Sequence, residues 1–476
     1  MERKNAWLKY DEAEMKACME YCEGYRRYLT ASKTERESVA EAVKLLKEHG
    51  YRDLKDVIAA GETLKAGDKV YSVNMDKTLS AFLIGEEPME KGMKILGAHV
   101  DSPRLDIKQN PLYEDMEMVL LDTHYYGGIK KYQWVATPLA LHGVVFKKDG
   151  SRVDVVIGEK EDDPVLCITD LLPHLGAKQM SKTAGSVIEG EDLNVLFGSM
   201  PVEPAEAKED ETEEEKAARE LAMKGKVKAN ILNLLKETYG IEEEDFLSAE
   251  LEVVPAGACR DLGIDRSMLM GYGHDDRVCA YTSLTALLSL DKVDRTCVCS
   301  LVDKEEIGSA GATGIQSKYF ENEVAEVMNA LGQYSELKVR RALANSEMFS
   351  SDVSAAVDPN YPGVNEMKNS AFLAKGLTFN KFTGSRGKGG SNDANPEFIA
   401  KLRRIMDENE VSWQTAELGR VDEGGGGTIA RYMAEYNMQV IDSGVPVLSM
   451  HAPWEVVSKA DVYEAMKGYT AFLKNA

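Results

Sequence analysis

The histidines give the first indication of chemistry, because the chain has only seven of them among 476 residues, against 80 aspartates and glutamates. His99, in KILGAHVDSP, and His451, in VPVLSMHAPW, each end an apolar run that we expect to be a strand. Ligands of α/β sheets gather at strand ends. Asp101 lies two residues after His99, so at strand spacing both side chains share a face. A carboxylate behind an imidazole orients it for metal binding, although a surface turn would give the same H-x-D triplet.

Three acidic segments could complete such a site. They are GYGHDDRVCAYTSL, with Asp275 and Asp276 where a loop opens a helix; DKEEIGS, with Glu305 and Glu306 after the apolar run RTCVCSLV; and MFSSDVSAAVDPNYPG, with Asp352. Taken singly, each segment has a simpler explanation: a helix cap with a salt bridge, a surface loop, or an N-cap.

Taken together, these side chains fit one centre for two divalent cations. Such a pair of ions, ~3.5–4 Å apart, needs a bridging carboxylate and further ligands for each ion. Histidine nitrogen and carboxylate oxygen supply the donors that these ions take. The proposed ligands are His99, Asp275, Glu306, Asp352 and His451. Glu305 is then free to act as the general base that takes a proton from a metal-activated water.

The elements that must position these residues suggest an α/β protein. Residues 11–49 favour helix, and 94–98 favour a short buried strand. After about residue 245, apolar runs alternate between strand and helix character, which is typical of a mostly parallel sheet.

Between these regions the pattern changes to short β-prone runs punctuated by Gly and Asp. We therefore expect a catalytic domain of residues 1–105 plus 246–476, interrupted by an inserted β-rich domain of residues 106–245. The acidic stretch 203–222 within the insertion is expected to be a solvated helix or a loop.

Composition excludes some classes of protein. A formal net charge of -23 disfavours non-specific nucleic-acid binding. No run approaches ~20 apolar residues, so no membrane span is expected.

The seven cysteines have no zinc-like spacing, which indicates reduced thiols. Cys297 and Cys299 should share a buried strand face. The charged first residues lack the apolar core of a signal peptide, so the expected location is the cytoplasm.

The motifs GAHVDSPRL, HDDR, DKEEIGS, SSDVSAAVDPNY and SMH, in this order and nearly from end to end of the chain, resemble the M18 metalloaminopeptidases. The resemblance implies an α/β zinc-peptidase domain with a mixed sheet flanked by helices, interrupted by a β-rich dimerisation domain. It also implies dimers assembled into a hollow dodecamer, and two divalent metal ions per subunit, with zinc expected and cobalt or manganese as alternatives.

The resemblance further implies individual roles. Asp275 would bridge both ions, Asp101 would orient His99, and Glu305 would be the catalytic base. His174, in TDLLPHLGAKQM, would reach the active site of a neighbouring subunit and bind substrate there. The substrates would be peptides with a free N-terminus, cut after the first residue.

Several points stay open at this stage. Aspartyl enzymes of the family often carry histidines where this chain has Ala355 and Asp358, so both acidic and neutral N-terminal residues remain possible substrates. Lys381 could bind a substrate carboxylate or be a solvated loop lysine, and His274 could support the metal site, although a loop position is favoured. Gly424 to Gly427 could line the pocket or form a plain turn.

The alternative functions are a related two-metal carboxypeptidase or deacylase, and a non-catalytic assembly protein. An intact Glu305 and a full set of ligands argue against the last of these.

Overall fold

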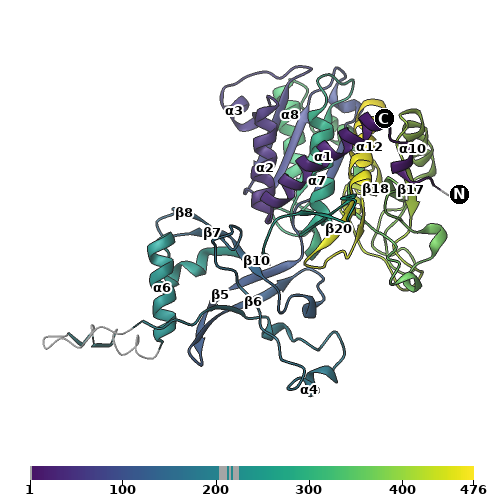
Figure 1. Cartoon of the computed structure of the whole chain (residues 1–476). Helices are drawn as coiled ribbons and strands as arrows, with labels where there is room; N and C mark the ends of the chain where they lie inside the picture. The colour runs from purple at the N-terminus through teal and green to yellow at the C-terminus, as the bar shows by residue number, and fades with distance from the viewer. Residues whose placement is uncertain (1–2, 203–211, 214–215, 218–224) are drawn as a thin grey trace. The chain divides into compact units, whose positions relative to one another are not determined.

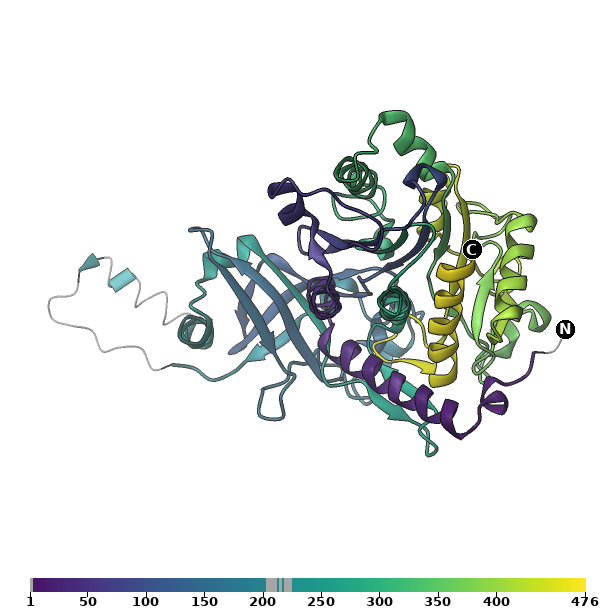
Figure 2. The same cartoon turned by 90° about the horizontal axis from the view of Figure 1, so that it is seen from above.

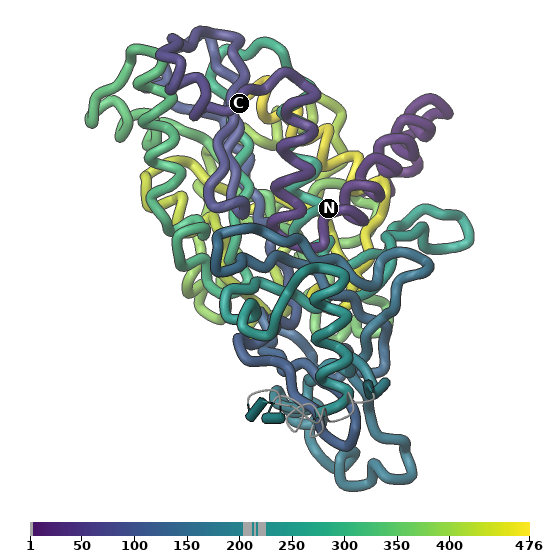
Figure 3. The backbone as a smooth tube through the Cα atoms, turned by 90° about the vertical axis from the view of Figure 1, so that its left-hand side faces the viewer, coloured from purple at the N-terminus to yellow at the C-terminus, as the bar shows by residue number. Residues whose placement is uncertain are grey.

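The computed structural model describes residues 3–202, 212–213, 216–217 and 225–476. The chain forms two compact units, Met1–Ser102 with Cys259–Ala476, and Pro103–Ala258 (Figure 1). Both chain ends belong to the first unit (Figure 3). Most of the acidic stretch 203–222 lies outside the described residues, so its expected structure is not addressed further.

The first unit is built on a nine-stranded mixed sheet. Its strand order is β1 (Arg52–Asp53), β2 (Lys69–Asn74), β3 (Thr78–Leu83), β13 (Cys297–Val302), β4 (Lys94–His99), β14 (Glu347–Ser350), β18 (Gln439–Gly444), β16 (Leu377–Asn380), β17 (Trp413–Ala416). The central neighbours β13, β4, β14 and β18 are parallel. Antiparallel pairs, such as β3 with β13 and β16 with β18, lie on either side of them. The expected α/β class with a mixed sheet is confirmed.

The central strands are apolar at nearly every position because both of their faces are covered. Every residue of β4 and β13 is buried. Ile95 packs in one hydrophobic cluster and Leu96 in another, so adjacent residues face opposite layers. Cys297 and Cys299 both belong to the cluster of Leu96, as their spacing predicted.

Helices form the two covering layers, and α7 and α12 lie beside the strands in Figure 2. The helices of this unit are α1 (Glu12–Ala31), α2 (Glu35–Glu48), α3 (Leu54–Ala59), α7 (His274–Leu288), α8 (Tyr319–Ala330), α9 (Glu336–Ala344), α10 (Pro396–Glu408), α11 (Ala430–Ala434) and α12 (Lys459–Asn475). Short 3-10 turns add η1 (Ala6–Lys9), η2 (Met89–Lys91), η6 (Glu305–Ile307), η7 (Pro362–Val364) and η8 (Met367–Asn369).

The helical region 11–49 is two helices, α1 and α2, and not one. Thr34 accepts a hydrogen bond from the backbone N–H of Glu37, while the Glu37 side chain accepts one from the Thr34 backbone. This capping box satisfies N–H groups at the start of α2 and fixes the break between the helices.

A smaller five-stranded sheet holds the apolar run before His451. Its order is β11 (Arg260–Leu262), β12 (Met268–Gly271), β20 (Glu455–Ser458), β19 (Pro446–Leu448), β15 (Ser354–Ala355). The strand β19 therefore lies outside the main sheet and ends three residues before His451. A short apolar run does not reveal which sheet it joins.

The second unit has a six-stranded antiparallel sheet in the order β8 (Arg152–Ile157), β7 (Leu139–Phe146), β10 (Ala249–Pro255), β5 (Arg104–Asp115), β6 (Met118–Tyr126), β9 (Val195–Gly198). It also contains α4 (Ala177–Met180), α6 (Lys226–Tyr239), η3 (Lys131–Gln133), η4 (Gly190–Asp192) and η5 (Glu243–Ser248). The strand β10 pairs with both β5 and β7, so residues beyond 245 belong to this sheet. Catalytic and dimerisation roles for the two units remain predictions.

Among the described residues, no helix combines the length and the apolar character needed to cross a membrane.

The packing of β14 against α12 yields a stability prediction. Phe349, fully buried in β14, stacks on Phe472 of α12 with ring centroids 4.0 Å apart. We expect Phe349→Ala to lower the free energy of unfolding by about 3–5 kcal/mol, because the substitution leaves a cavity in the core. Leu337→Ala, at a side chain 57% exposed on α9, is the control and should change little. Urea titration followed by circular dichroism measures both, and equal small effects would contradict this account of the core.

Candidate metal centre

The centre forms where three neighbouring parallel strands end. His99 is the last residue of β4, and it pairs in register with Val302, the last residue of β13. Glu305 follows β13 within η6, and Asp352 follows β14 by two residues. Parallel strands bring their carboxyl ends to one edge of the sheet, so segments far apart in sequence meet there.

Asp101 connects His99 to the turn that carries the two glutamates. Nδ1 of His99 lies 2.9 Å from the Asp101 carbonyl oxygen and 3.3 Å from its Oδ1. The Asp101 carboxylate also accepts hydrogen bonds from the backbone N–H groups of Glu305, at 3.1 Å, and Glu306, at 3.2 Å. One buried carboxylate thus fixes both an imidazole and η6, which leaves Nε2 of His99 directed at the other acids.

Asp275 lies between the two histidines. Its Oδ1 is 3.1 Å from Nε2 of His99, and its Oδ2 is 3.2 Å from Nε2 of His451. Burial would raise the pKa of the Asp275 carboxyl, but its contacts with the two histidines hold that pKa below its ordinary value. Each oxygen of this carboxylate therefore faces a different nitrogen donor.

Glu305, Glu306 and Asp352 surround this arrangement. Oε1 of Glu306 lies 3.4 Å from Nε2 of His451, and Oε2 of Glu305 lies 3.9 Å from Nε2 of His99. Burial, together with the charges of Asp101 and Asp275, raises the pKa of Glu305 to about 7. Burial and neighbouring acids also raise the pKa of Glu306 and of Asp352 well above their ordinary values.

The donors fit a metal ion. Among the described residues, the first unit holds three overlapping sets of donor atoms, each within 4.8 Å of one another: His99 with Asp275 and Glu306; His99 with Glu305 and Asp352; Asp275 with Asp276 and Asp352. Bonds of ~2.0–2.1 Å to a tetrahedral zinc ion place neighbouring donors about 3.3 Å apart. The separations around Asp275 match this spacing, and the buried Oε1 of Glu306 accepts no hydrogen bond.

The segment that carries Asp275 differs from the loop favoured for His274. His274 is the first residue of α7, is fully buried, and has its Nδ1 2.6 Å from the hydroxyl of Tyr25. Burial lowers the pKa of His274 to about 3, so the imidazole is neutral. The Tyr25 side chain of α1, 249 residues away in sequence, covers this histidine, and the next two residues, Asp275 and Asp276, have non-helical backbone angles. Asp276 accepts a hydrogen bond from the backbone N–H of His99 at 3.3 Å.

Glu455 was missed by the sequence analysis. It opens β20 and is 1% exposed. Its Oε1 accepts the backbone N–H of His451 at 2.7 Å, and its Oε2 accepts that of Asp275 at 3.0 Å. The available signal was its position four residues after His451, as an acid at the start of the apolar run VVS. With 80 acids in the chain, that signal is weak.

The two residues predicted to bind substrate, Lys381 and His174, belong to segments other than those that carry the metal-site donors. Lys381 follows β16, and its ammonium forms an ion pair with Asp393. His174 is exposed in the second unit, in the loop before α4. Their predicted roles are taken up below as proposals.

The glycine run is a close-packed loop. Gly425 has φ +121°, and a Cβ on it would come within 2.3 Å of Ser385 Cα. The Gly426 N–H donates to the Thr383 carbonyl at 2.9 Å, and the Thr428 hydroxyl donates to Asp442 at 2.6 Å. Glycine is therefore required there for backbone contact with residues 383–385.

Ala355 lies in β15 and Asp358 in the loop that follows it.

Comparisons with known proteins agree with this geometry. The model of the family described as aminopeptidase I zinc metalloprotease (M18) matches residues 28–473. A protein of Clostridium acetobutylicum named "Probable M18 family aminopeptidase 1" is 59% identical over 474 residues, covering 100% of this chain and 98% of that protein. A crystal structure of an M18 family aminopeptidase from Thermotoga maritima is similar with a TM-score of 0.91 and 41% identity, covering 100% of both chains. The yeast mApe1 dodecamer is similar in fold, with a TM-score of 0.72 and 21% identity, over 94% of this chain and 95% of that one.

The position of Glu455 yields a prediction about metal retention. Glu455→Ala should weaken zinc affinity by about 10–100-fold, because it leaves the backbones of His451 and Asp275 without their shared acceptor. Glu455→Gln keeps one carbonyl oxygen and should fall between Glu455→Ala and the unmodified protein. Zinc competition with a chromophoric chelator measures this affinity. The control is Glu408→Ala, on an exposed part of α10. If Glu455→Ala and Glu408→Ala retained zinc equally well, the positioning role would be ruled out.

Proposed function

Because this chain belongs to the M18 family of zinc aminopeptidases, we propose that it removes single N-terminal residues from peptides at a centre that holds two zinc ions. Membership in the family makes the chain a metal-dependent aminopeptidase, a hydrolase acting on peptides. The carboxypeptidase, deacylase and non-catalytic alternatives are set aside on the same ground. The observation that carries the two-ion proposal is the position of Asp275, with one oxygen toward each histidine.

The donor geometry supports a division of ligands between two ions. His451 and Glu306 lie on the Oδ2 side of Asp275 and would hold one zinc ion. His99 and Asp352 belong to the other side and would hold the second. Asp275 would bridge them, as a carboxylate between two metals does. Cobalt and manganese remain alternatives, because mixed histidine and carboxylate donors discriminate poorly among such ions.

The centre suits hydrolysis of a peptide bond. Bound zinc ions would polarise the scissile carbonyl and make water a better nucleophile at neutral pH. Glu305 is the residue proposed to take the proton from the attacking water and to return it to the leaving amine. Asp101 supports this role because it accepts the Glu305 backbone N–H and holds the side chain beside His99.

Selectivity for the amino end would follow from coordination. The free α-amine of a peptide would donate its nitrogen lone pair to one of the ions, whereas the amide nitrogen of an acetylated terminus is a poor donor. His174 is proposed to contribute to substrate binding at a neighbouring subunit's site. Lys381 could bind a substrate carboxylate only by leaving Asp393, so its proposed role is the weaker of the two.

We also propose a homo-oligomer, a dodecamer assembled from dimers, in the cytoplasm. The fold shared with the yeast mApe1 dodecamer supports the assembly. The exposure of His174 leaves this residue accessible to another subunit. All seven cysteines are free, which suits a reducing compartment.

The role of Glu305 can be tested directly. Glu305→Gln should retain zinc but lower kcat by about 10²–10⁴-fold, because glutamine cannot accept the proton. Turnover of an aminoacyl-naphthylamide and the zinc content of the same sample provide the two readouts. Glu326→Gln, on an exposed position of α8, should leave both unchanged. Wild-type turnover in Glu305→Gln would refute this assignment.

The metal requirement gives a second prediction. Protein stripped with a chelator should be inactive, and activity should return on zinc titration until two equivalents per chain are bound. The titration is followed with a peptide that has a free α-amine and with its N-acetyl counterpart, which should resist cleavage throughout. Saturation at one equivalent would reject the two-ion proposal, and cleavage of the acetylated peptide would reject selectivity for the free amine.

A further inference from the structure

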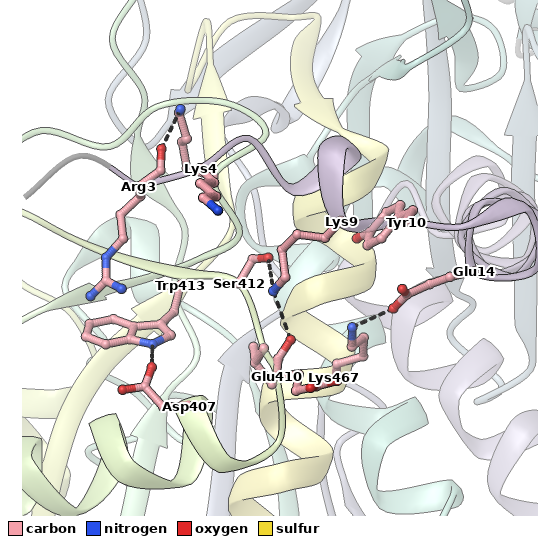
Figure 4. Close-up of a pocket in the computed structure, with 12 residues that line it drawn as sticks. Arg3, Lys4, Lys9, Tyr10, Glu14, Asp407, Glu410, Ser412, Trp413 and Lys467 are labelled. Carbon is pink, nitrogen blue, oxygen red and sulfur yellow. Dashed lines mark hydrogen bonds and ion pairs between the residues drawn. The ribbon is translucent and has the colours of Figure 1, made fainter.

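A cavity of about 630 Å³ lies in the first unit and shares no lining residue with the metal centre (Figure 4). One wall is the N-terminal arm, residues 3–10, which includes η1. The other walls come from the segment 410–413, which leads into β17, and from Lys375 before β16. The helices α1, α10 and α12 add Glu14, Asp407 and Lys467. Its volume falls within the range of ~300–1,000 Å³ that is usual for small-molecule sites.

The lining is rich in cations although the protein is acidic. Five cationic and three acidic side chains surround the cavity, in a chain with a net charge of -23: Arg3, Lys4, Lys9, Lys375 and Lys467 against Glu14, Asp407 and Glu410. Of the cations, Lys467 pairs with Glu14 at 2.7 Å and with the buried Glu464 at 3.1 Å. Among the described residues, no carboxylate lies within ion-pair distance of the other four.

Neutral groups hold three of these cations in place. Nζ of Lys9 donates to the Glu410 carbonyl at 3.0 Å and to the Ser412 hydroxyl at 2.9 Å. Nζ of Lys375 donates to the Arg3 carbonyl at 2.7 Å. The Arg3 guanidinium lies 3.8 Å from the centre of the Trp413 ring, and Figure 4 shows it over that ring. These contacts fix the side chains without neutralising their charge.

The nearby acids are used elsewhere or are exposed. Asp407 accepts the Trp413 indole N–H at 2.9 Å, and Glu14 is held by Lys467. Glu410 is exposed to solvent. Cationic side chains therefore outnumber acidic ones along the lining, and Arg3, Lys4, Lys9 and Lys375 are left to attract an anion.

We propose that this cavity binds a small oxyanion that carries phosphate or carboxylate groups. Ammonium and guanidinium groups form their strongest hydrogen bonds with such oxygens. The anion would bridge Arg3, Lys4 and Lys9 on the arm to Lys375 on the body of the unit. Backbone contact already joins these parts, because the Ala6 N–H donates to the Ala374 carbonyl at 2.7 Å. Binding therefore fastens the N-terminal arm to the body, independently of the peptidase reaction.

Calorimetric titration of the full-length, zinc-loaded protein with inorganic phosphate, and separately with tricarballylate, tests this proposal. Lys9→Met/Lys375→Met should weaken binding of the preferred anion at least about tenfold, because two charged donors are lost. Whichever anion binds more tightly identifies the natural ligand as a phosphate or a polycarboxylate. Lys47→Met/Lys91→Met removes the same charge at exposed positions of the same unit and should bind like the unmodified protein.

Two further outcomes complete the test. Lys9→Arg/Lys375→Arg keeps the charges and should retain binding, which separates loss of charge from damage to the fold. If Lys9→Met/Lys375→Met and its control bound each anion equally well, the anion would lie at the metal centre or elsewhere, and the proposal would be overturned. Failure of both anions to bind the unmodified protein would also overturn it. Neither result bears on the proposed peptidase function.

Discussion

The candidate centre depends on acids packed together with two histidines at one edge of the main sheet. Asp275 and Asp276 are buried there, and Glu305, Glu306 and Asp352 are partly buried beside them. Carboxylates buried together raise one another's pKa and are costly to keep ionised. Two histidines offset part of this cost, since they hold Asp275 ionised, but the acids outnumber them. Bound metal cations would supply the missing positive charge, and the grouped donors fit such cations.

Two further carboxylates hold the donors in place through the backbone. Asp101 accepts the N–H groups of Glu305 and Glu306, and Glu455 accepts those of His451 and Asp275. Each ties segments that are distant in sequence, 204 residues apart for Asp101 and Glu305 and 180 for Glu455 and Asp275. These acids orient ligands and need no metal contact of their own. The positions of the donor side chains are therefore set by contacts with distant segments, and not only by the local turns that carry the donors.

The cavity beside the N-terminal arm is lined mainly by cations, whereas the metal centre is lined mainly by acids. At the metal centre, crowded acids are enclosed and backed by the central strands. At the cavity, Arg3, Lys9 and Lys375 are held by an aromatic ring and by neutral oxygens at the edge of the unit. In both places, side chains of one sign outnumber those of the opposite sign. That common feature is what a site needs in order to attract a ligand of the opposite sign.

The sequence by itself determined the family and the α/β class, and it predicted the β-rich insertion and the residues of the candidate centre. Rare histidines at the ends of apolar strands, and acids directly after such strands, are local patterns that sequence reasoning can detect. Only the tertiary structure decided that His274 is buried against Tyr25, that β19 belongs to a separate small sheet, and that Glu455 joins two ligand backbones. Likewise, it brought Arg3 and Lys9 together with Lys375. These features arise from contacts between distant segments. The local sequence around one acid among 80, or around one lysine, does not show that the residue makes such a contact.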